Sequence, residues 1–315
     1  MRIFNHCFET LTEDDIKLLK EYFKGYDYQG SSYTFLTSYI WRETYCLCWE
    51  KIGDYVFLAG VDCMLTDGNP VIAMPLTRDG KYDTKLLGEA IIEAKRRFSQ
   101  RKKPLIIANI NEDMKKILEE ALPGQLVFEH DRDDDDYVYN KEKLIKLSGR
   151  ALHKKKNHMN FFLKNYQFES RPLDKSMAAE ILALVDQVAG NKADSYTQDE
   201  LTSLEMEKCA IEEMIGCLDD ENVHSVGIFI DGQMEGFAIG ELLSSHVAVE
   251  HFEKANGQFR GLYQVVCSQF CQMLPEQVTH VNREEDMGLE TLRQAKEALR
   301  PEYMVEKWTA RFKDN

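Results

Sequence analysis

Hydrophobic residues in the second half of the chain recur at two spacings, one typical of helices and one typical of strands. Apolar residues three or four positions apart predict helices at residues 175–189 and 260–273. Further helices are predicted after Thr197 and at residues 288–299. Asp174 stands directly before the first of these helices, and we expect its carboxylate to cap it.

Between these helices lie three apolar segments with the length of strands. Residues 224–230 end at Asp231 and Gly232, a pair that tolerates positive φ and therefore predicts a hairpin. Residues 234–243 return, and a third strand is expected at 246–252. Shorter strands are predicted on either side of this meander, at residues 167–171, 277–282 and 303–312.

The first half of the chain repeats this order of elements more faintly. Helices are predicted at residues 14–23, 32–40, 84–98 and 112–122. Strands are predicted at residues 44–51, 55–61, 71–76, 105–110 and 125–130. The halves show no residue-by-residue repeat, so the duplication is one of element order. This order predicts an α+β fold with a mixed sheet in each half.

A change of composition marks the junction between the halves. An acidic run at 131–136 is followed by a basic segment at 141–164, where apolar residues fall on one helical face. Gly149 interrupts this pattern, so Ser148 is expected to cap a second helix there. We therefore predict an N-terminal domain at residues 1–140, a basic connecting helix at 141–166 and a C-terminal domain at 167–315.

Charge is distributed unevenly along the 315 residues. The formal net charge is −15, which argues against a protein that coats nucleic acid with its whole surface. Residues 141–164 nevertheless hold seven lysines and Arg150 against one acid, Glu142, so the rest of the chain carries about −22. A basic stripe on an acidic body favours one localised anionic partner, such as a phosphate group.

Several features indicate a soluble, cytoplasmic protein. No stretch approaches the roughly 18 apolar residues of a membrane-spanning helix. The N-terminus lacks the basic start and apolar core of a secretory signal, and the eight cysteines do not form a disulfide framework. Any contact with a membrane would be peripheral, between residues 141–164 and anionic lipid.

Three segments carry a resemblance to known proteins. They read LSGRALHKKKNHMNFFLKNY at 147–166, VAVEHFEKANGQFRGLYQ at 247–264 and HVNREEDMGLETLRQAKEALRP at 280–301. They resemble the phosphatidylglycerol lysyltransferase C-terminal-domain family, and are most similar to its soluble, uncharacterised members. The element order is similar to the GNAT-type acyl-CoA N-acyltransferase fold. Two such units in tandem also resemble the peptidoglycan-bridge aminoacyltransferases.

This resemblance implies two tandem GNAT-like domains and a reaction in which an amine attacks an activated acyl group. In the GNAT-type fold, the donor's phosphates are implied at the helix after the third meander strand, because its first turn offers unpaired N–H groups. That turn contains Gly257, Gln258, Arg260, Gly261 and Tyr263. Gln258 and Gly261 match the pattern Q/R-x-x-G-x-G/A, whereas Tyr263 stands where a small residue is expected. The alternative is a glycine-rich helix start without a ligand.

A candidate general base lies just before this turn. Glu250 and Glu253 stand at the end of the third strand, where alternation places Glu250 with Ala248 and opposite Val247 and Val249. A carboxylate beside a partly apolar sheet would have a raised pKa and would serve as a base. The resemblance also places the family's acidic strand residue at Glu250. The alternative is a solvated strand end.

Polar residues also follow the next strand, at Asn282, Arg283 and Asp286. Strand ends at a crevice are good places for ligand groups. Asn282 would orient an amide, and Arg283 would pair with Asp286 or with an anionic substrate. The alternative is structural, with Asp286 capping the helix that begins near Gly288.

The basic segment has two interpretations. His153, Lys154, Lys155, Lys156 and Asn157 concentrate charge beside hydrogen-bonding groups, which favours a platform for RNA phosphates and suits an aminoacyl-tRNA donor. The alternative is a solvated helix that packs through its apolar stripe.

The sequence contains no convincing metal or nucleotide motif. Five residues fall at calcium-loop spacing, but an aspartate replaces the turn glycine; they are Asp131, Asp133, Asp135, Val138 and Glu142. Histidine and cysteine spacings do not match zinc sites, and there is no P-loop, GxSxG or GxGxxG pattern. We therefore predict no metal and no permanently bound cofactor, with acyl-CoA or aminoacyl-tRNA as co-substrate.

The sequence thus favours an N-acyltransferase or aminoacyltransferase. It would move an acyl or aminoacyl group to an amine or hydroxyl acceptor at a site in the C-terminal half. The alternative is a non-catalytic module that uses the same fold to bind a ligand or RNA.

Overall fold

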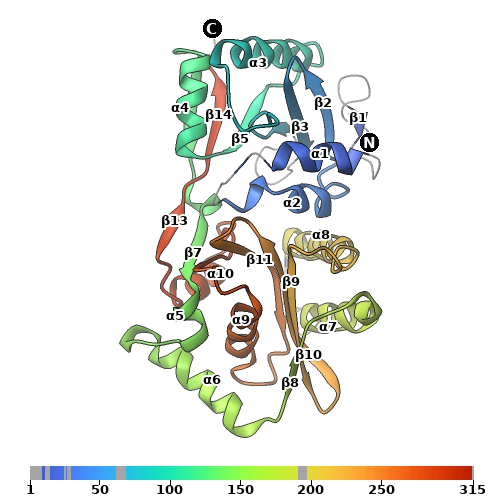
Figure 1. Ribbon diagram of the computed structural model, residues 1–315, viewed down its shortest axis with the longest axis vertical. Coiled ribbons are helices and arrows are strands. Elements are labelled where there is room, and N and C mark those ends of the chain that lie inside the picture. Colours follow the sequence, from blue (N-terminus) through green and yellow to red (C-terminus); the bar gives the residue numbers. More distant parts are fainter. Residues whose placement is uncertain are drawn as a thin grey trace. The chain divides into compact units, whose positions relative to one another are not determined.

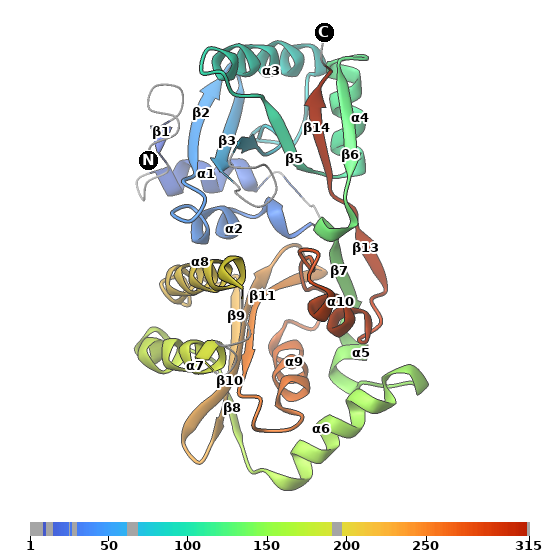
Figure 2. The ribbon, with the colours of Figure 1, turned by 180° about the vertical axis from the view of Figure 1, so that it is seen from behind.

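The computed structural model describes residues 9–10, 15–24, 26, 30–61, 69–190 and 197–313. The chain divides into two compact units (Figures 1 and 2). Unit 1 comprises residues 1–135 and 305–315, and unit 2 comprises residues 136–304. Each contains a seven-stranded sheet and its own apolar core.

Unit 1 has the strand order β1-β2-β3-β4-β5-β14-β6. Its strands are β1 (Glu9–Thr10), β2 (Cys48–Ile52), β3 (Tyr55–Val61), β4 (Pro70–Ile72), β5 (Ile106–Ile110), β6 (Leu126–His130) and β14 (Trp308–Phe312). Its helices are α1 (Ile16–Phe23), α2 (Phe35–Ile40), α3 (Thr84–Ser99) and α4 (Glu112–Ala121), with short 3-10 helices at Ser31–Tyr33 and Arg132–Asp134. Strand β3 is buried along its whole length, as expected for an apolar run inside a sheet.

Unit 2 has the strand order β13-β7-β12-β11-β10-β9-β8. Its strands are β7 (Asp136–Asn140), β8 (Glu169–Arg171), β9 (Val223–Ile230), β10 (Gln233–Leu242), β11 (Val247–Ala255), β12 (His280–Asn282) and β13 (Tyr303–Val305). Its helices are α5 (Lys141–Lys146), α6 (His153–Asn165), α7 (Ala178–Gly190), α8 (Gln198–Ile215), α9 (Leu262–Met273) and α10 (Glu290–Glu297), with 3-10 helices at Arg150–Leu152 and Lys175–Met177. Helices α7 and α8 cover one face of the sheet and α9 covers the other (Figures 1 and 2).

Two predictions in the second half are confirmed, the start of a helix after Thr197 and the hairpin at Asp231 and Gly232. Thr197 forms a capping box with Glu200 at the start of α8. Asp231 and Gly232 both have positive φ, 50° and 81°, in the turn between β9 and β10. The predicted cap at Ser148 is wrong, because Gly149 with φ 102° precedes the 3-10 helix that leads into α6.

The strands of the two sheets do not follow the division of the sequence into halves. Strand β7 comes directly after the strands of unit 1 in the sequence, but it pairs antiparallel with β12 of unit 2. Strand β14 returns at the end of the chain and lies between β5 and β6 of unit 1. The strand predicted at 303–312 is therefore two strands, β13 and β14, that belong to different sheets.

The boundaries of the units differ from the predicted domains because of this exchange. The chain enters unit 2 at residue 136 rather than at 141 or 167, and it leaves at residue 304. Residues 141–166 are part of unit 2, since Leu144, Leu152, Met159 and Phe162 belong to its apolar core. The basic segment thus packs mainly against α9 of unit 2 through its apolar side.

Candidate functional site

Strands β11 and β12 separate part-way along their length in unit 2. They pair in parallel at Val247 with His280, Ala248 with Val281 and Val249 with Asn282. Strand β12 ends there, while β11 continues to Ala255 along β10. Residues 250–255 therefore lie beyond the last β12 partner, and side chains there are placed beside the loop that follows β12.

A β-bulge lies at the point where these strands separate. Gly240 pairs with Glu250, and the preceding Ile239 pairs with Phe252, so His251 is an extra residue in β11. Gly240 allows the close approach, because a Cβ there would be 2.0 Å from the Val249 carbonyl oxygen.

The bulge places two carboxylates on one face of the sheet. Simple alternation puts residues 250 and 253 on opposite faces, but the extra residue reverses the alternation after Glu250. Glu250 and Glu253 consequently pair with Gly240 and Ala238, which both face α9. The sequence pattern alone did not reveal this pairing, because a bulge has no clear signature in β11.

Arg283 joins these two carboxylates directly after β12. Its Nε is 3.1 Å from Glu250 Oε2, and its Nη2 donates to Glu250 Oε1 at 3.3 Å and to the Glu253 carboxylate. The side chains of Glu250, Glu253 and Arg283 are 1%, 13% and 14% exposed. Arg283 therefore pairs with β11, and the predicted pairing with Asp286 is wrong.

Burial changes the proton affinity of this cluster. Burial raises the pKa of Glu250 to about 8, although the positive charge of Arg283 opposes the shift. Lys155 of α6 is half-buried, and its pKa is lowered by burial and by the charge of Arg283. A carboxyl group that titrates near neutral pH is suited to accept a proton from a nucleophile.

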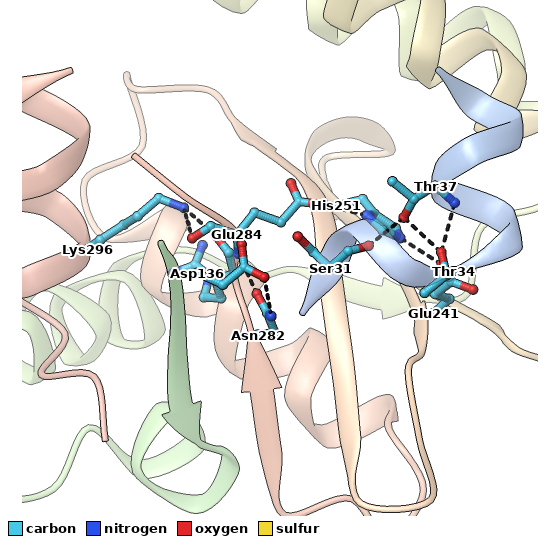
Figure 3. A network of polar contacts seen from close by, with 10 residues as sticks. Ser31, Thr34, Thr37, Asp136, Glu241, His251, Asn282, Glu284 and Lys296 are labelled. Atoms are coloured by element: carbon cyan, nitrogen blue, oxygen red, sulfur yellow. Dashed lines mark hydrogen bonds and ion pairs between the residues drawn. The ribbon is translucent and has the colours of Figure 1, made fainter. Parts of the chain in front are cut away.

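The opposite face of the bulge is held by His251. Its Nδ1 is 2.8 Å from Glu284 Oε1 and its Nε2 is 3.2 Å from Glu241 Oε1 (Figure 3). Burial alone would lower the pKa of His251, but the two carboxylates outweigh it and raise the pKa to about 10. His251 is therefore a buried cation that ties β10 and β11 to the loop after β12.

Asn282 is occupied by structural hydrogen bonds. Its Nδ2 donates to Asp136 Oδ2 at 2.8 Å, and its Oδ1 accepts from the Glu284 N–H at 2.7 Å (Figure 3). Lys296 donates to the carbonyl oxygens of Arg283 and Glu284 from the other side. These contacts fix the backbone that carries Arg283, so Asn282 supports the cluster from a fully buried position.

Asp286 lies in a separate set of contacts. Its carboxylate accepts from the Gly288 N–H at 2.9 Å, from Arg293 at 2.7 Å and from the Tyr137 hydroxyl at 2.5 Å. Burial opposes the shift, but these hydrogen bonds hold the pKa of Asp286 well below its usual range. The structure thus supports the alternative interpretation of Asp286 as a residue that holds the turn before α10.

The predicted donor-phosphate turn is partly covered by α6. Helix α9 begins at Leu262, after Gly261 with φ 95°. A Cβ on Gly261 would be 2.1 Å from the His158 carbonyl oxygen of α6, and the Arg260 guanidinium stacks 4.9 Å from the Phe161 ring centre. The Gln258 N–H donates to Asn256 Oδ1, and Tyr263 is exposed. A helix backbone therefore stands beside the turn where phosphates were expected.

The structure separates the basic residues into two groups. Lys141 is buried and donates to the Pro275 carbonyl oxygen at 2.8 Å, while Lys143 and Lys146 pair with Glu302 and Glu142. The lysines of α6 differ, since Lys154, Lys156 and Lys164 form no ion pair with any residue that the structure describes. On the same helix, Asn157 Nδ2 is 3.4 Å from His153 Nδ1. Within residues 141–164, apart from the buried Lys141, the lysines without an ion pair therefore lie on α6.

The residues at calcium-loop spacing do not converge. Asp131 caps the N–H of Asp133, and Asp135 accepts from Lys307 N and pairs with His130. Within the described ranges, no group of three acidic, histidine or cysteine residues is arranged to hold a metal ion. In the same ranges, no helix is both long and apolar enough to cross a membrane.

Comparisons with known proteins agree with this architecture. The family model described as phosphatidylglycerol lysyltransferase, C-terminal, matches residues 23–311. A conserved protein of unknown function from Bacteroides thetaiotaomicron is 24% identical, with a TM-score of 0.83 over 97% of this chain and 99% of that one. L-PGS from Bacillus licheniformis is 12% identical, with a TM-score of 0.64 over 99% and 95%. FemX is 10% identical, with a TM-score of 0.61 over 96% and 97%.

A curated relative is an uncharacterized protein of Mycoplasmoides gallisepticum, 23% identical over 180 residues and 55% of this chain. The chain spans about half of that relative, 54% of its length. With the two mixed sheets described above, these likenesses show a tandem GNAT-like fold.

Proposed function

The chain belongs to the phosphatidylglycerol lysyltransferase C-terminal family, and from that membership we propose that it is an aminoacyltransferase. Its substrates would be an activated aminoacyl ester and an amine or hydroxyl acceptor. The observation that carries the proposal is a buried glutamate, Glu250, placed by a bulge where β11 and β12 separate, with its pKa raised to about 8.

Glu250 would act as the general base. It accepts the proton of the acceptor as the acceptor nitrogen or oxygen forms a bond to the ester carbonyl carbon. The ester C–O bond then breaks, and the proton returns from Glu250 to the leaving oxygen. Arg283 would stabilise negative charge on the carbonyl oxygen, while Asn282 and Asp286 hold the surrounding backbone.

Two features support aminoacyl-tRNA rather than acyl-CoA as the donor. The α6 backbone packs against Gly261, and Arg260 stacks on Phe161 of α6, so these two residues of the turn are already engaged by α6 rather than open to phosphates bound in the GNAT manner. The unpaired lysines of α6 offer instead a positive surface for RNA phosphates.

A labelled-donor assay tests this proposal. The purified chain is incubated with tRNA charged with radioactive amino acids, or with radioactive acetyl-CoA, and with phosphatidylglycerol vesicles or soluble amines as acceptors. We expect label to move from tRNA to one acceptor and none to move from acetyl-CoA. Transfer from acetyl-CoA alone would reverse the choice of donor. No transfer from either donor would leave the non-catalytic binding module as the better description.

Replacing three lysines of α6 tests how the donor is held. We expect Lys154→Ala/Lys156→Ala/Lys164→Ala to weaken tRNA binding and to flatten the slope of log K against log salt by about two to three, because each lost phosphate contact contributes about 0.9. Fluorescence anisotropy with labelled tRNA at several salt concentrations measures both.

The matched control is Lys143→Ala/Lys146→Ala on α5, whose lysines are already paired with Glu302 and Glu142. An equal loss of binding in both variants would mean that tRNA responds to net charge rather than to α6.

A further inference from the structure

Charged side chains span the gap between β11 and the loop that follows β12. Backbone pairing between the two strands ends at Asn282. On the face toward α9, Arg283 reaches across to Glu250. On the opposite face, Glu284 reaches across to His251, the extra residue of the bulge. Two consecutive residues of the loop therefore bridge the gap with opposite charges, one on each face.

The backbone of Glu284 shows that this arrangement has to be held in place. Its φ is 58°, in the left-handed region that few residues other than glycine adopt. Such a conformation costs free energy and persists only where the surrounding contacts over-determine it. Here Lys296 donates to the Glu284 carbonyl oxygen at 3.2 Å, and the Glu284 N–H donates to Asn282 Oδ1 at 2.7 Å. The left-handed residue turns the chain, so β12 does not continue along β11.

The ion pair between His251 and Glu284 lasts throughout the neutral pH range. The His251 side chain is 1% exposed, and its two ring nitrogens face Glu284 at 2.8 Å and Glu241 at 3.2 Å. A ring that faces a carboxylate at both nitrogens donates from both, which only the imidazolium can do. These carboxylates raise the pKa of His251 to about 10 although burial opposes the shift. Losing either carboxylate leaves a buried charge with one partner fewer, which is costly.

We propose that the ion pair between His251 and Glu284 positions Arg283 for the proposed transfer, by fixing the width of the gap between β11 and the loop after β12. Glu284 directly follows Arg283, so a displaced Glu284 moves the backbone that carries the guanidinium. His251 and Glu284 are positioning residues, since they act from the face of the sheet opposite Glu250. The inference rests on the proposed function and adds to it the residues that keep the base and its arginine together.

The pKa of Glu250 reports how firmly Arg283 is held, because the charge of Arg283 lowers that pKa against the effect of burial. Glu284→Ala breaks the bridge and removes a negative charge, whereas His251→Leu breaks it and removes a positive charge. Through-space charge alone would lower the pKa of Glu250 in Glu284→Ala and raise it in His251→Leu. A loosened Arg283 would raise it in both variants. The sign of the shift in Glu284→Ala therefore separates position from charge.

NMR of side-chain carboxyl carbons tests the proposal in the full chain. Glutamate labelled with carbon-13 is titrated from about pH 5 to about pH 10, and Glu250→Gln assigns the signal. We expect the Glu250 midpoint to rise by about one pH unit in Glu284→Ala, the lower end of what a neighbouring arginine contributes. A midpoint that falls or stays at the wild-type value in Glu284→Ala overturns the proposal. If His251→Leu does not fold, Glu284→Ala decides alone, because His251 there keeps its pair with Glu241.

Both variants leave the other titratable groups around the cluster in place. The groups that face Glu250 or Arg283 are Glu253, Lys155, Cys267, Tyr139 and Lys296. The matched control is Lys254→Met, which removes a pair of the same kind from the same strand. Lys254 pairs with Glu207 of α8 at 2.6 Å and does not bridge the gap. An equal rise of the Glu250 midpoint in Lys254→Met would overturn the assignment to His251 and Glu284.

The positioning role and the proposed function fail in different ways. Where transfer is measurable, Glu284→Ala should move the rise of kcat/KM with pH upward by the same amount as the NMR midpoint. If the midpoint moves and no donor is consumed, the transfer reaction is wrong and the positioning role stands. If transfer occurs and the midpoint does not move, the positioning role is wrong and the transfer reaction stands. Circular dichroism and the melting temperature of each variant separate a shifted pKa from a loss of fold.

Discussion

Replacing Glu250 by glutamine is expected to lower kcat/KM for aminoacyl transfer by about 10²–10⁴-fold, the usual contribution of a positioned general base. Glutamine keeps the size of the side chain and its contact with Arg283 but cannot accept a proton. The wild-type rate should rise with pH as Glu250 loses its proton near pH 8, and the residual rate of the variant should lack this rise. Initial rates of transfer between pH 6 and pH 9.5 measure both, once the rate of spontaneous hydrolysis of the donor ester at each pH has been subtracted.

The same substitution should also change how the stability of the fold depends on pH. Because the pKa of Glu250 is raised from 4.5 to about 8, the folded state binds more protons than the unfolded state between those pH values. Stability contributed by the protonated carboxyl is therefore lost as pH rises through that window. Glu250→Gln should show a flatter dependence of melting temperature on pH. A variant with wild-type activity and an unchanged pH profile would rule out Glu250 as the base.

Ending the chain after Lys307 is expected to unfold unit 1. The deletion removes β14, which pairs with β5 on one side and β6 on the other and carries the fully buried Ala310. The loss of two ladders and of core contacts should cost on the order of 5 kcal/mol or more, comparable to the whole stability of a domain. Hydrogen exchange with mass spectrometry should show lost protection in β5 and β6, while β10 and β11 of unit 2 remain protected.

The control for this deletion is Arg311→Ala, which keeps the strand and removes only an exposed pair with Glu129. It should change stability by less than about 1 kcal/mol. A truncated chain that keeps the protection of β5 and β6 would show that unit 1 does not need the strand between them.

The helices and most strands were predictable because their apolar spacing is a local property. The strand at 303–312 shows the limit of such reasoning, since period-2 alternation does not say which sheet a strand joins. The residues that form β13 and β14 read as one strand, and only their pairing in three dimensions separates them. The boundaries of the two units differ from those of the predicted domains for the same reason.

The site was predictable in part. The position of Glu250 and the direction of its pKa shift followed from a carboxylate in an apolar strand. The pairing of Glu250 with Glu253 was not, because a bulge opposite Gly240 breaks the alternation on which the prediction depended. Counting charges likewise found the basic segment but did not show that Lys143 and Lys146 are neutralised by neighbours.

The placement of β14 has a consequence for how the protein is made. The ribosome produces β5 and β6 long before it produces the strand that separates them, residues 308–312. At about 5–20 residues per second, the nascent chain carries these two unpaired strand edges for on the order of ten seconds or more. Unit 2 is complete in sequence by residue 304, so it can finish folding first and reverse the usual order from N-terminus to C-terminus. Chaperones that bind exposed strands would meet this protein at its N-terminal half.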